Sequence, residues 1–210
     1  SIGKIKALAK ESGAVVKTVS RKKLDEMAPQ IHHQGVLAVC ACAEYVTVEE
    51  ILNVSKEKGT EPFIILADEI EDPHNLGAIL RTAEAAGADG VIIPKRRSAS
   101  LTATVHKTSA GAASVVKVAR VSNLVACMKE LKQHNIWIYG ADMDGGLFSK
   151  TDLRGPVALV IGSEGKGISR LVKEECDFIV SLPMFGQINS LNASVAAGIL
   201  MYEVVRQRQE

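Results

Sequence analysis

The stretch Val157-Ala158-Leu159-Val160-Ile161-Gly162-Ser163-Glu164-Gly165-Lys166-Gly167 decides the fold class. Its five leading apolar residues predict a strand that is buried on both faces, and the glycines predict a tight turn that another group can approach closely. The glycine spacing is G-x-x-G-x-G, which matches neither the dinucleotide fingerprint G-x-G-x-x-G nor a phosphate loop ending in G-K-[ST]. Glu164 is expected to be exposed at the carboxyl end of the strand. On spacing alone, a structural turn and a ligand-binding turn both remain open.

Similar apolar runs alternate with helical stretches from residue 63 onward. We expect strands at 63–67, 90–93, 114–118, 136–140, 157–161 and 178–182. We expect helices near 75–87, 103–111, 122–134, 166–175 and 190–208. Strands that alternate with helices in this way predict an α/β fold with a mostly parallel sheet covered on both faces.

The first 46 residues follow a different pattern. They predict a helix at 2–12, a strand at 15–19, a helix from Arg21 and a strand at 36–43. This fragment is too small to bury a good core by itself. Residues 47–60 are rich in Glu and Lys and predict a surface helix and linker.

Composition excludes several classes of protein. The chain has 210 residues, of which 47% are hydrophobic, and its net charge is +1, so a disordered chain is excluded. Its apolar runs are far shorter than the roughly 18 residues that cross a bilayer, and no secretory signal opens the sequence. We therefore expect a cytoplasmic protein without membrane contact. Its four cysteines lack metal-site spacing, which favours buried thiols over a metal site formed by Cys40 and Cys42 with His32 and His33.

The charges are unevenly distributed along the chain. Residues 1–23 hold seven basic side chains and one acidic one, and Lys95-Arg96-Arg97 forms a second basic group. Acidic residues between 68 and 72 offset them in the sum. Local patches rather than net charge decide phosphate binding, so either basic group is a candidate nucleic-acid surface or simply a solvated face.

A second motif, Asp72-Pro73-His74-Asn75-Leu76-Gly77-Ala78-Ile79-Leu80-Arg81, follows the strand at 63–67 and opens a helix. Asn75 suits the N-cap of that helix. Gly77 and Arg81 are four residues apart, so the Arg81 guanidinium is expected to pass over Gly77 toward the helix start. The alternative is a simple salt bridge from Arg81 to Asp72.

A third motif, Leu182-Pro183-Met184-Phe185-Gly186-Gln187-Ile188-Asn189-Ser190-Leu191-Asn192-Ala193-Ser194, joins the last strand to the last helix. Asn189, Ser190 and Asn192 supply more polar side-chain groups than one helix cap requires. The excess indicates a functional loop, and the apolar spacing further along the helix indicates packing.

Together the three segments resemble the three motifs of the SpoU/TrmH family of S-adenosylmethionine-dependent RNA ribose 2′-O-methyltransferases, within the SPOUT superfamily. The residues that carry the resemblance are Asn75-Leu76-Gly77 with Arg81, Ile161-Gly162-Ser163-Glu164-Gly165, and Leu182-Pro183-Met184 with Ser190-Leu191-Asn192-Ala193-Ser194. They occur in the family order over residues 63–208. Pro94-Lys95-Arg96-Arg97 and Ser194-Val195-Ala196-Ala197-Gly198 are similar to the RlmB-like branch, which methylates a guanosine of 23S ribosomal RNA. Ile31-His32-His33-Gln34-Gly35-Val36 resembles the end of that branch's ribosomal-protein-like RNA-binding domain, whose front part is not matched.

The resemblance implies a partial RNA-binding domain at 1–46, a linker at 47–60 and a catalytic domain at 61–210 that ends in a trefoil knot. It implies a homodimer that acts on RNA, most directly ribosomal RNA, with S-adenosylmethionine as cofactor and no metal. The catalytic positions it implies are Asn75, Arg81, Glu164, Ser190 and Asn192. The cofactor-binding positions it implies are Gly140, Gly162, Leu182, Pro183, Met184 and Leu191.

Physical chemistry favours an electrostatic role for Arg81. A ribose 2′-hydroxyl is a very weak acid, and a neighbouring cation stabilises the alkoxide that forms as its proton leaves. Arginine stays protonated, so we expect Arg81 to stabilise charge and to position a phosphate rather than to act as a base. Asn75, Ser190 and Asn192 are expected to orient Arg81, the ribose and the loop, and Glu164 to fix Arg81 or a backbone amide.

Three other functions remain open. The first is ribose methylation of transfer RNA instead of ribosomal RNA. A non-catalytic RNA-binding or ribosome-assembly factor would keep the same fold, and cofactor binding without methyl transfer would favour it. A nucleotide-dependent oxidoreductase is disfavoured because the first strand–helix turn lacks the dinucleotide fingerprint.

Overall fold

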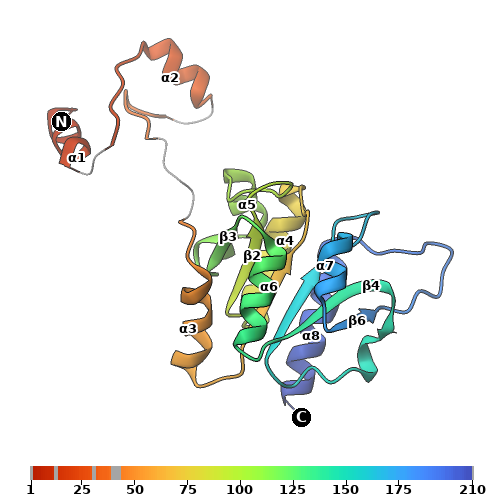
Figure 1. Ribbon diagram of the computed structural model, residues 1–210. Coiled ribbons are helices and arrows are strands. Elements are labelled where there is room, and N and C mark those ends of the chain that lie inside the picture. Colours follow the sequence, from red (N-terminus) through yellow and green to blue (C-terminus); the bar gives the residue numbers. More distant parts are fainter. Residues whose placement is uncertain (1, 12–13, 30–31, 39–43, 210) are drawn as a thin grey trace. The chain divides into compact units, whose positions relative to one another are not determined.

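The structure is a computed structural model that describes residues 2–11, 14–29, 32–38 and 44–209 (Figure 1). The chain forms two compact units, residues 1–40 and 41–210. In the first unit, α1 (Ile2–Glu11) and α2 (Arg21–Met27) are helical. Ser20 caps α2 by accepting a hydrogen bond from the N–H of Lys23.

The second unit is a six-stranded parallel sheet with helices between its strands. Its strands are β1 (Phe63–Ala67), β2 (Gly90–Pro94), β3 (Val118–Val121), β4 (Trp137–Leu147), β5 (Val157–Ile161) and β6 (Phe178–Ser181). Its helices are α3 (Val48–Lys58), α4 (Pro73–Ala85), α5 (Ala103–Thr108), α6 (Leu124–Gln133), α7 (Arg170–Glu175) and α8 (Ala193–Gln209), with short 3-10 turns η1 (Ala112–Ser114) and η2 (Phe148–Lys150). The strand order is β3-β2-β1-β5-β4-β6. The expected α/β fold with a parallel sheet is confirmed.

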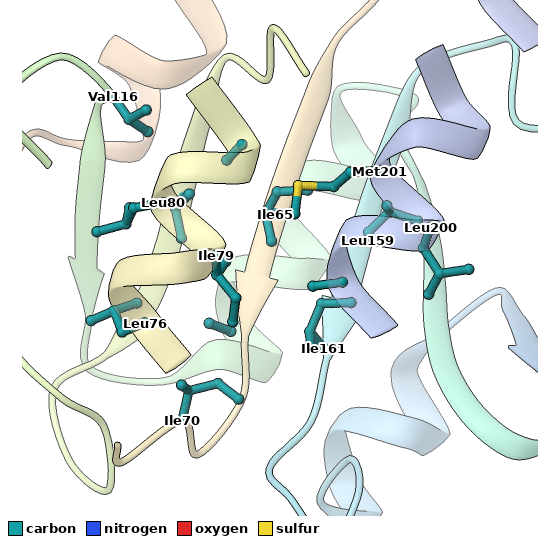
Figure 2. Close-up of a cluster of buried hydrophobic side chains, with 14 of the residues drawn as sticks. Ile65, Ile70, Leu76, Ile79, Leu80, Val116, Leu159, Ile161, Leu200 and Met201 are labelled. Carbon is teal, nitrogen blue, oxygen red and sulfur yellow. The ribbon is translucent and has the colours of Figure 1, made fainter. Parts of the chain in front are cut away.

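Alternate residues of each central strand enter different cores, which is why these strands are apolar throughout. Ile65 of β1 and Leu159 of β5 pack against α4 and α8, as Figure 2 shows. Ile64 and Ala158 face the opposite way and pack with α3, α6 and α7. Each face of the sheet is therefore covered by its own helical layer.

The segment at 47–60, expected as a surface helix and linker, is an integral part of this unit. Thr47 and Glu50 form a reciprocal capping box at the start of α3. Ile51 and Leu52 are buried in the core beneath α3. The charged residues occupy the outer face of α3, and the few apolar ones suffice to dock it.

Four expected strands differ in the structure. The strand expected at 136–140 is longer and runs from Trp137 to Leu147 as β4. The strand expected at 114–118 lies instead at Val118–Val121, because Gly111 adopts a left-handed backbone (φ 90°) and starts the turn η1. Residues 15–19 form no strand. Val15 is 85% exposed, and a strand needs a hydrogen-bonded neighbour. Of the strand expected at 36–43, residues 36–38 are not in a strand and the remainder lies outside the described residues.

Two helices start later than expected. Gly165 and Gly167 have left-handed backbones (φ 77° and 66°), so the helix expected from 166 begins at Arg170. The last helix begins at Ala193 rather than 190. No helix in the described part of the chain is both long and apolar enough to cross a bilayer.

Candidate active site

The three motifs meet at the edge of the sheet formed by the carboxyl ends of the strands. Asn75 lies in the first turn of α4, Glu164 in the turn after β5, and Asn192 directly before α8. The Nδ2 atom of Asn75 donates to Oε1 of Glu164 (3.0 Å). The Nδ2 atom of Asn192 donates to Oδ1 of Asn75 (2.9 Å) and also to Oε1 of Glu164. These contacts join residues that are far apart in the sequence into one triangle of side chains.

Asn192 also fixes the start of α8. Its Oδ1 atom accepts hydrogen bonds from the Ser194 N–H (3.0 Å), the Ser194 hydroxyl (2.6 Å) and the Val195 N–H (3.3 Å). The amide oxygen of Asn192 thus caps the helix, and its amide nitrogen is left to donate to Asn75 and Glu164. The orientation of the triangle follows from the start of α8.

The N-cap of α4 differs from the expectation. Asp72, not Asn75, accepts from the His74 N–H (2.9 Å), and Pro73 takes the first helical position. This cap frees Asn75, which is 8% exposed, to contribute its whole side chain to the triangle.

A cavity of about 560 Å³ opens beside Glu164 at the carboxyl ends of β4, β5 and β6. Gly162, Leu182, Met184, Leu191 and Ser190 line it, as expected for site residues. The wall also contains apolar side chains from Ile161, Val180, Ala193 and Ala196 and charged ones from Asp142, Asp144, Lys166, Arg170 and Lys173. Its size is within the range of about 300–1,000 Å³ that small-molecule sites occupy.

Two expected cofactor positions lie outside this wall. Neither Gly140 nor Pro183 is among the described residues that line the cavity. A Cβ atom on Gly140 would come within 2.8 Å of the sulfur of Cys176 and 3.0 Å of Ile168 and Ile179. Gly140 therefore allows close packing beneath the cavity.

The glycine turn after β5 has the shape that its spacing indicated. Ser163 and Gly167 exchange two backbone hydrogen bonds, of 3.1 and 2.9 Å. A Cβ atom on Gly162 would overlap the backbone of Gly167 and Ile168, so only glycine fits there. Beyond the turn, the buried carboxylate of Asp68 accepts from the Ser169 N–H (2.7 Å) and ties this loop to the end of β1.

Sequence reasoning missed an ion-pair cluster in the cavity wall. Lys173 of α7 binds Asp142 (2.9 Å) and Asp144 (3.2 Å), both from β4. The hydrogen bond to Asp142 is the largest cause of a raised Lys173 pKa, so this lysine stays charged. The available signal was the pair Asp142-x-Asp144 directly after the apolar stretch 136–140, at the edge of the sheet where ligands bind.

The position expected for Arg81 is wrong. Gly77 does not leave a path for its guanidinium, because a Cβ atom on Gly77 would overlap the side chain of Thr108 in α5. Arg81 is exposed on α4 and makes no hydrogen bond or ion pair to a described residue, so neither Asp72 nor Glu164 holds it. Glu164 is fixed instead by the two amide groups of the triangle.

The cavity fits S-adenosylmethionine by its donor set as well as by its size. The apolar wall suits the adenine ring and the methionine chain, and the glycine turn at 162–167 forms part of the lining. The wall carries three carboxylates (Asp142, Asp144 and Glu164) and three cations (Lys166, Arg170 and Lys173), which suits a ligand that has a sulfonium, an ammonium and a carboxylate group.

Comparison with known proteins gives one consistent family. The profile of the SpoU rRNA Methylase family matches residues 62–202, and that of the RNA 2'-O ribose methyltransferase substrate binding domain matches residues 1–46. YacO of Bacillus subtilis, assigned to the TrmH family of tRNA/rRNA methyltransferases, is 52% identical over 202 residues, which cover 96% of this chain and 81% of YacO.

Two solved structures are similar in fold and sequence. The SpoU methyltransferase AviRb from Streptomyces viridochromogenes, in complex with the cofactor AdoMet, is 32% identical with a TM-score of 0.68, over 71% of this chain and 59% of AviRb. An RNA 2'-O ribose methyltransferase is 31% identical with a TM-score of 0.66, over 80% of this chain and 60% of that one. This chain therefore belongs to the SpoU/TrmH family of RNA methyltransferases, whose cofactor is S-adenosylmethionine.

Proposed function

We propose that this protein transfers a methyl group from S-adenosylmethionine to the 2′-hydroxyl of a guanosine ribose in 23S ribosomal RNA. The observation that carries the proposal is the triangle of Asn75, Glu164 and Asn192 beside the cavity. The similarity of residues 1–46 to a ribose-methyltransferase substrate-binding domain supports ribose as the acceptor. The similarity of Pro94–Arg97 to the RlmB-like branch supports the guanosine of 23S ribosomal RNA.

The residues of the cavity hold the cofactor in one orientation. S-adenosylmethionine supplies an electrophilic methyl group carried on a sulfonium. Gly162, Leu182, Met184 and Leu191 enclose it, and the adjacent Glu164 carboxylate favours its positive charge. Asn75 and Asn192 keep that carboxylate in place, so it needs no reorganisation during the reaction.

Arg81 acts on the RNA. Because its side chain is exposed and outside the triangle, its guanidinium is available to bind the phosphate beside the target ribose through two parallel hydrogen bonds. The same positive charge stabilises the oxygen as its proton passes to solvent water, while the methyl group leaves the sulfonium and S-adenosylhomocysteine remains. Ser190 is exposed on the cavity wall, and this exposure supports a role for its hydroxyl in hydrogen bonding the ribose.

The working form is a homodimer in the cytoplasm, where its RNA is made. One face of α8 enters the core, and the other exposes Val195, Ile199 and Tyr202 at helical spacing. A second copy would cover this apolar stripe. The catalytic domain ends in a trefoil knot, and the segment 1–46 binds the RNA substrate.

Mapping ribose methylation in RNA tests the proposal. Ribosomal and transfer RNA from cells with and without the protein are compared nucleotide by nucleotide. We expect one guanosine of 23S ribosomal RNA to lose its 2′-O-methyl group when the protein is absent. Loss of a methyl group from transfer RNA instead would overturn the choice of substrate, and an unchanged map in both RNAs would overturn the catalytic function.

A further inference from the structure

The basic turn Lys95-Arg96-Arg97 lies on the same edge of the sheet as the triangle. It follows β2, which pairs with β1, and β1 pairs with β5, whose end carries Glu164. Neighbouring strands lie about 4.8 Å apart, so the basic turn and the glycine turn start about 10 Å from each other. The loop that leads from β1 to Asn75 lies between them.

The backbone of the basic turn is fixed at its first residue. The Lys95 N–H donates to the carbonyl of Val121 (2.8 Å), and the Lys95 carbonyl accepts from Nη2 of Arg120 (3.0 Å). The Arg120 guanidinium in turn lies over the ring of Tyr45, 5.5 Å from its centroid. Two neighbouring elements thus determine where Lys95 and Arg96 project.

The last residue of the turn is fixed from the other side. Arg97 binds Glu69 of the loop after β1 (3.0 Å), and the Ala99 N–H donates to the carbonyl of Ile70 (2.8 Å). Arg97 and Glu69 both have left-handed backbones, with φ of 55° and 51°. Such a backbone is unfavourable for side chains of this kind and persists only where the surroundings hold it. Arg97 therefore serves to hold the turn.

The side chains of Lys95 and Arg96, by contrast, are not held by any described residue. Both side chains are exposed and make no hydrogen bond or ion pair to a described residue. Some cations elsewhere in residues 44–209 are paired with carboxylates, such as Lys58, Lys132 and Lys173, and others, such as Lys107 and Lys166, are in no ion pair with a described residue. Lys95 and Arg96 differ from the other unpaired cations because they are adjacent and lie on a turn whose backbone is held at both ends.

We propose that Lys95 and Arg96 form a preformed phosphate-binding element that grips the RNA strand beside the methylated nucleotide. This inference rests on the proposed function and adds a substrate contact to it. Glu71 and Asp72 are exposed on the intervening loop and repel phosphate, so the contact is confined to the turn after β2. A preformed turn loses little entropy on binding, which favours tight contact from only two side chains.

RNA affinity at several salt concentrations tests this element. The probe is unmodified 23S ribosomal RNA transcribed in vitro, and the variant is Lys95→Ala with Arg96→Ala. The matched control is Lys56→Ala with Lys150→Ala, which removes the same charge from exposed positions on α3 and η2. S-adenosylmethionine affinity is measured for each protein to verify that the fold is intact.

We expect the turn variant to bind RNA at least about tenfold more weakly, and the slope of log affinity against log salt to fall by about 1.4–1.8, the value for two lost phosphate contacts. Its KM for RNA should rise while its kcat at saturating RNA stays near that of the unchanged protein. The control should keep both RNA affinity and slope. If the turn variant has the same salt slope and the same KM as the unsubstituted protein, this inference alone is overturned. If the unsubstituted protein binds no RNA, the proposed function is overturned as well.

Discussion

Asn192 shows how one residue links the fold to the chemistry. Its amide oxygen caps α8 and its amide nitrogen reaches Asn75 and Glu164, so the same side chain fixes the start of the helix and forms part of the triangle. The sequence predicted that Asn75, Glu164 and Asn192 belong to one site. It did not predict that they contact each other, because hydrogen-bond partners 89 and 117 residues apart are set by the sheet topology.

Asn75→Ala tests the triangle. The substitution removes one of the two acceptors of the Asn192 amide and one of the two amide donors that hold Glu164, so we expect kcat to fall by about 10²-fold through loss of positioning. Asn75 does not line the cavity, so the dissociation constant of S-adenosylmethionine should change little. Single-turnover methyl transfer and calorimetry measure the two effects, with Asn53→Ala on α3 as the control. Normal turnover of the Asn75→Ala variant would show that the triangle does not contribute to catalysis.

Substitutions of Arg81 test whether this exposed side chain of α4 binds the RNA phosphate and stabilises the reacting oxygen. We expect Arg81→Ala to lower methyl transfer by at least about 10²-fold, the usual loss when a group that stabilises an oxyanion is removed. Arg81→Lys should also be severely impaired, because an ammonium cannot form the planar two-pronged contact with phosphate. Melting temperature and cofactor affinity should be unchanged in both. Near-normal turnover of the lysine variant would show that the shape of this group is unimportant.

At the scale of elements, α4 and α5 pack closely because Gly77 has no side chain. From the sequence, we expected Gly77 to leave a path for the Arg81 guanidinium. The contact with Thr108 could not be predicted, because only the three-dimensional structure brings Thr108 against Gly77. Strand and helix locations were predicted well where apolar runs were long, as at 63–67 and 157–161. They were predicted poorly at 114–118, where a left-handed Gly111 displaced the strand.

Gly77→Ala should destabilise the protein although alanine is the better helix former. The new Cβ atom would overlap Thr108, and overpacking of this kind costs about 1–3 kcal/mol. Urea denaturation followed by circular dichroism gives the free energy of unfolding. Adding Thr108→Ala should restore part of the loss. Gly155→Ala, whose Cβ atom meets nothing within 4 Å, is the control, and equal effects of Gly77→Ala and Gly155→Ala would contradict this packing.

At the scale of the whole molecule, the end of α8 is hydrogen-bonded to the loops that precede two strands of the sheet. Arg208 donates to the carbonyls of Glu61 (3.0 Å), Pro62 (2.8 Å) and Gly155 (2.7 Å), at the starts of β1 and β5. Gln207 accepts from the Leu153 N–H (2.8 Å) nearby. No periodicity in the sequence predicts such contacts, because they depend on where a helix end meets loops more than fifty residues away.

The division into two units predicts separable functions. Removing residues 1–40 retains two hydrogen bonds at the start of the second unit. The Leu101 N–H still donates to the Tyr45 hydroxyl, and the Val46 N–H still donates to the carbonyl of Val118. We expect the shortened protein to keep its cofactor affinity and to bind RNA more weakly, with a smaller salt slope because fewer phosphates are neutralised. Filter binding across a salt series measures this. An unchanged slope in a folded protein would contradict RNA binding by the first unit.

The position of the transferred methyl group tests the central claim most directly. The protein is incubated with isotopically labelled S-adenosylmethionine and unmodified 23S ribosomal RNA, and the RNA is digested to nucleosides for mass spectrometry. We expect the label in 2′-O-methylguanosine, at a rate at least about 10²-fold lower after Arg81→Ala. Label on a nucleobase, or a protein that binds S-adenosylmethionine and the RNA but transfers no methyl group, would contradict the assignment of this site to ribose methylation.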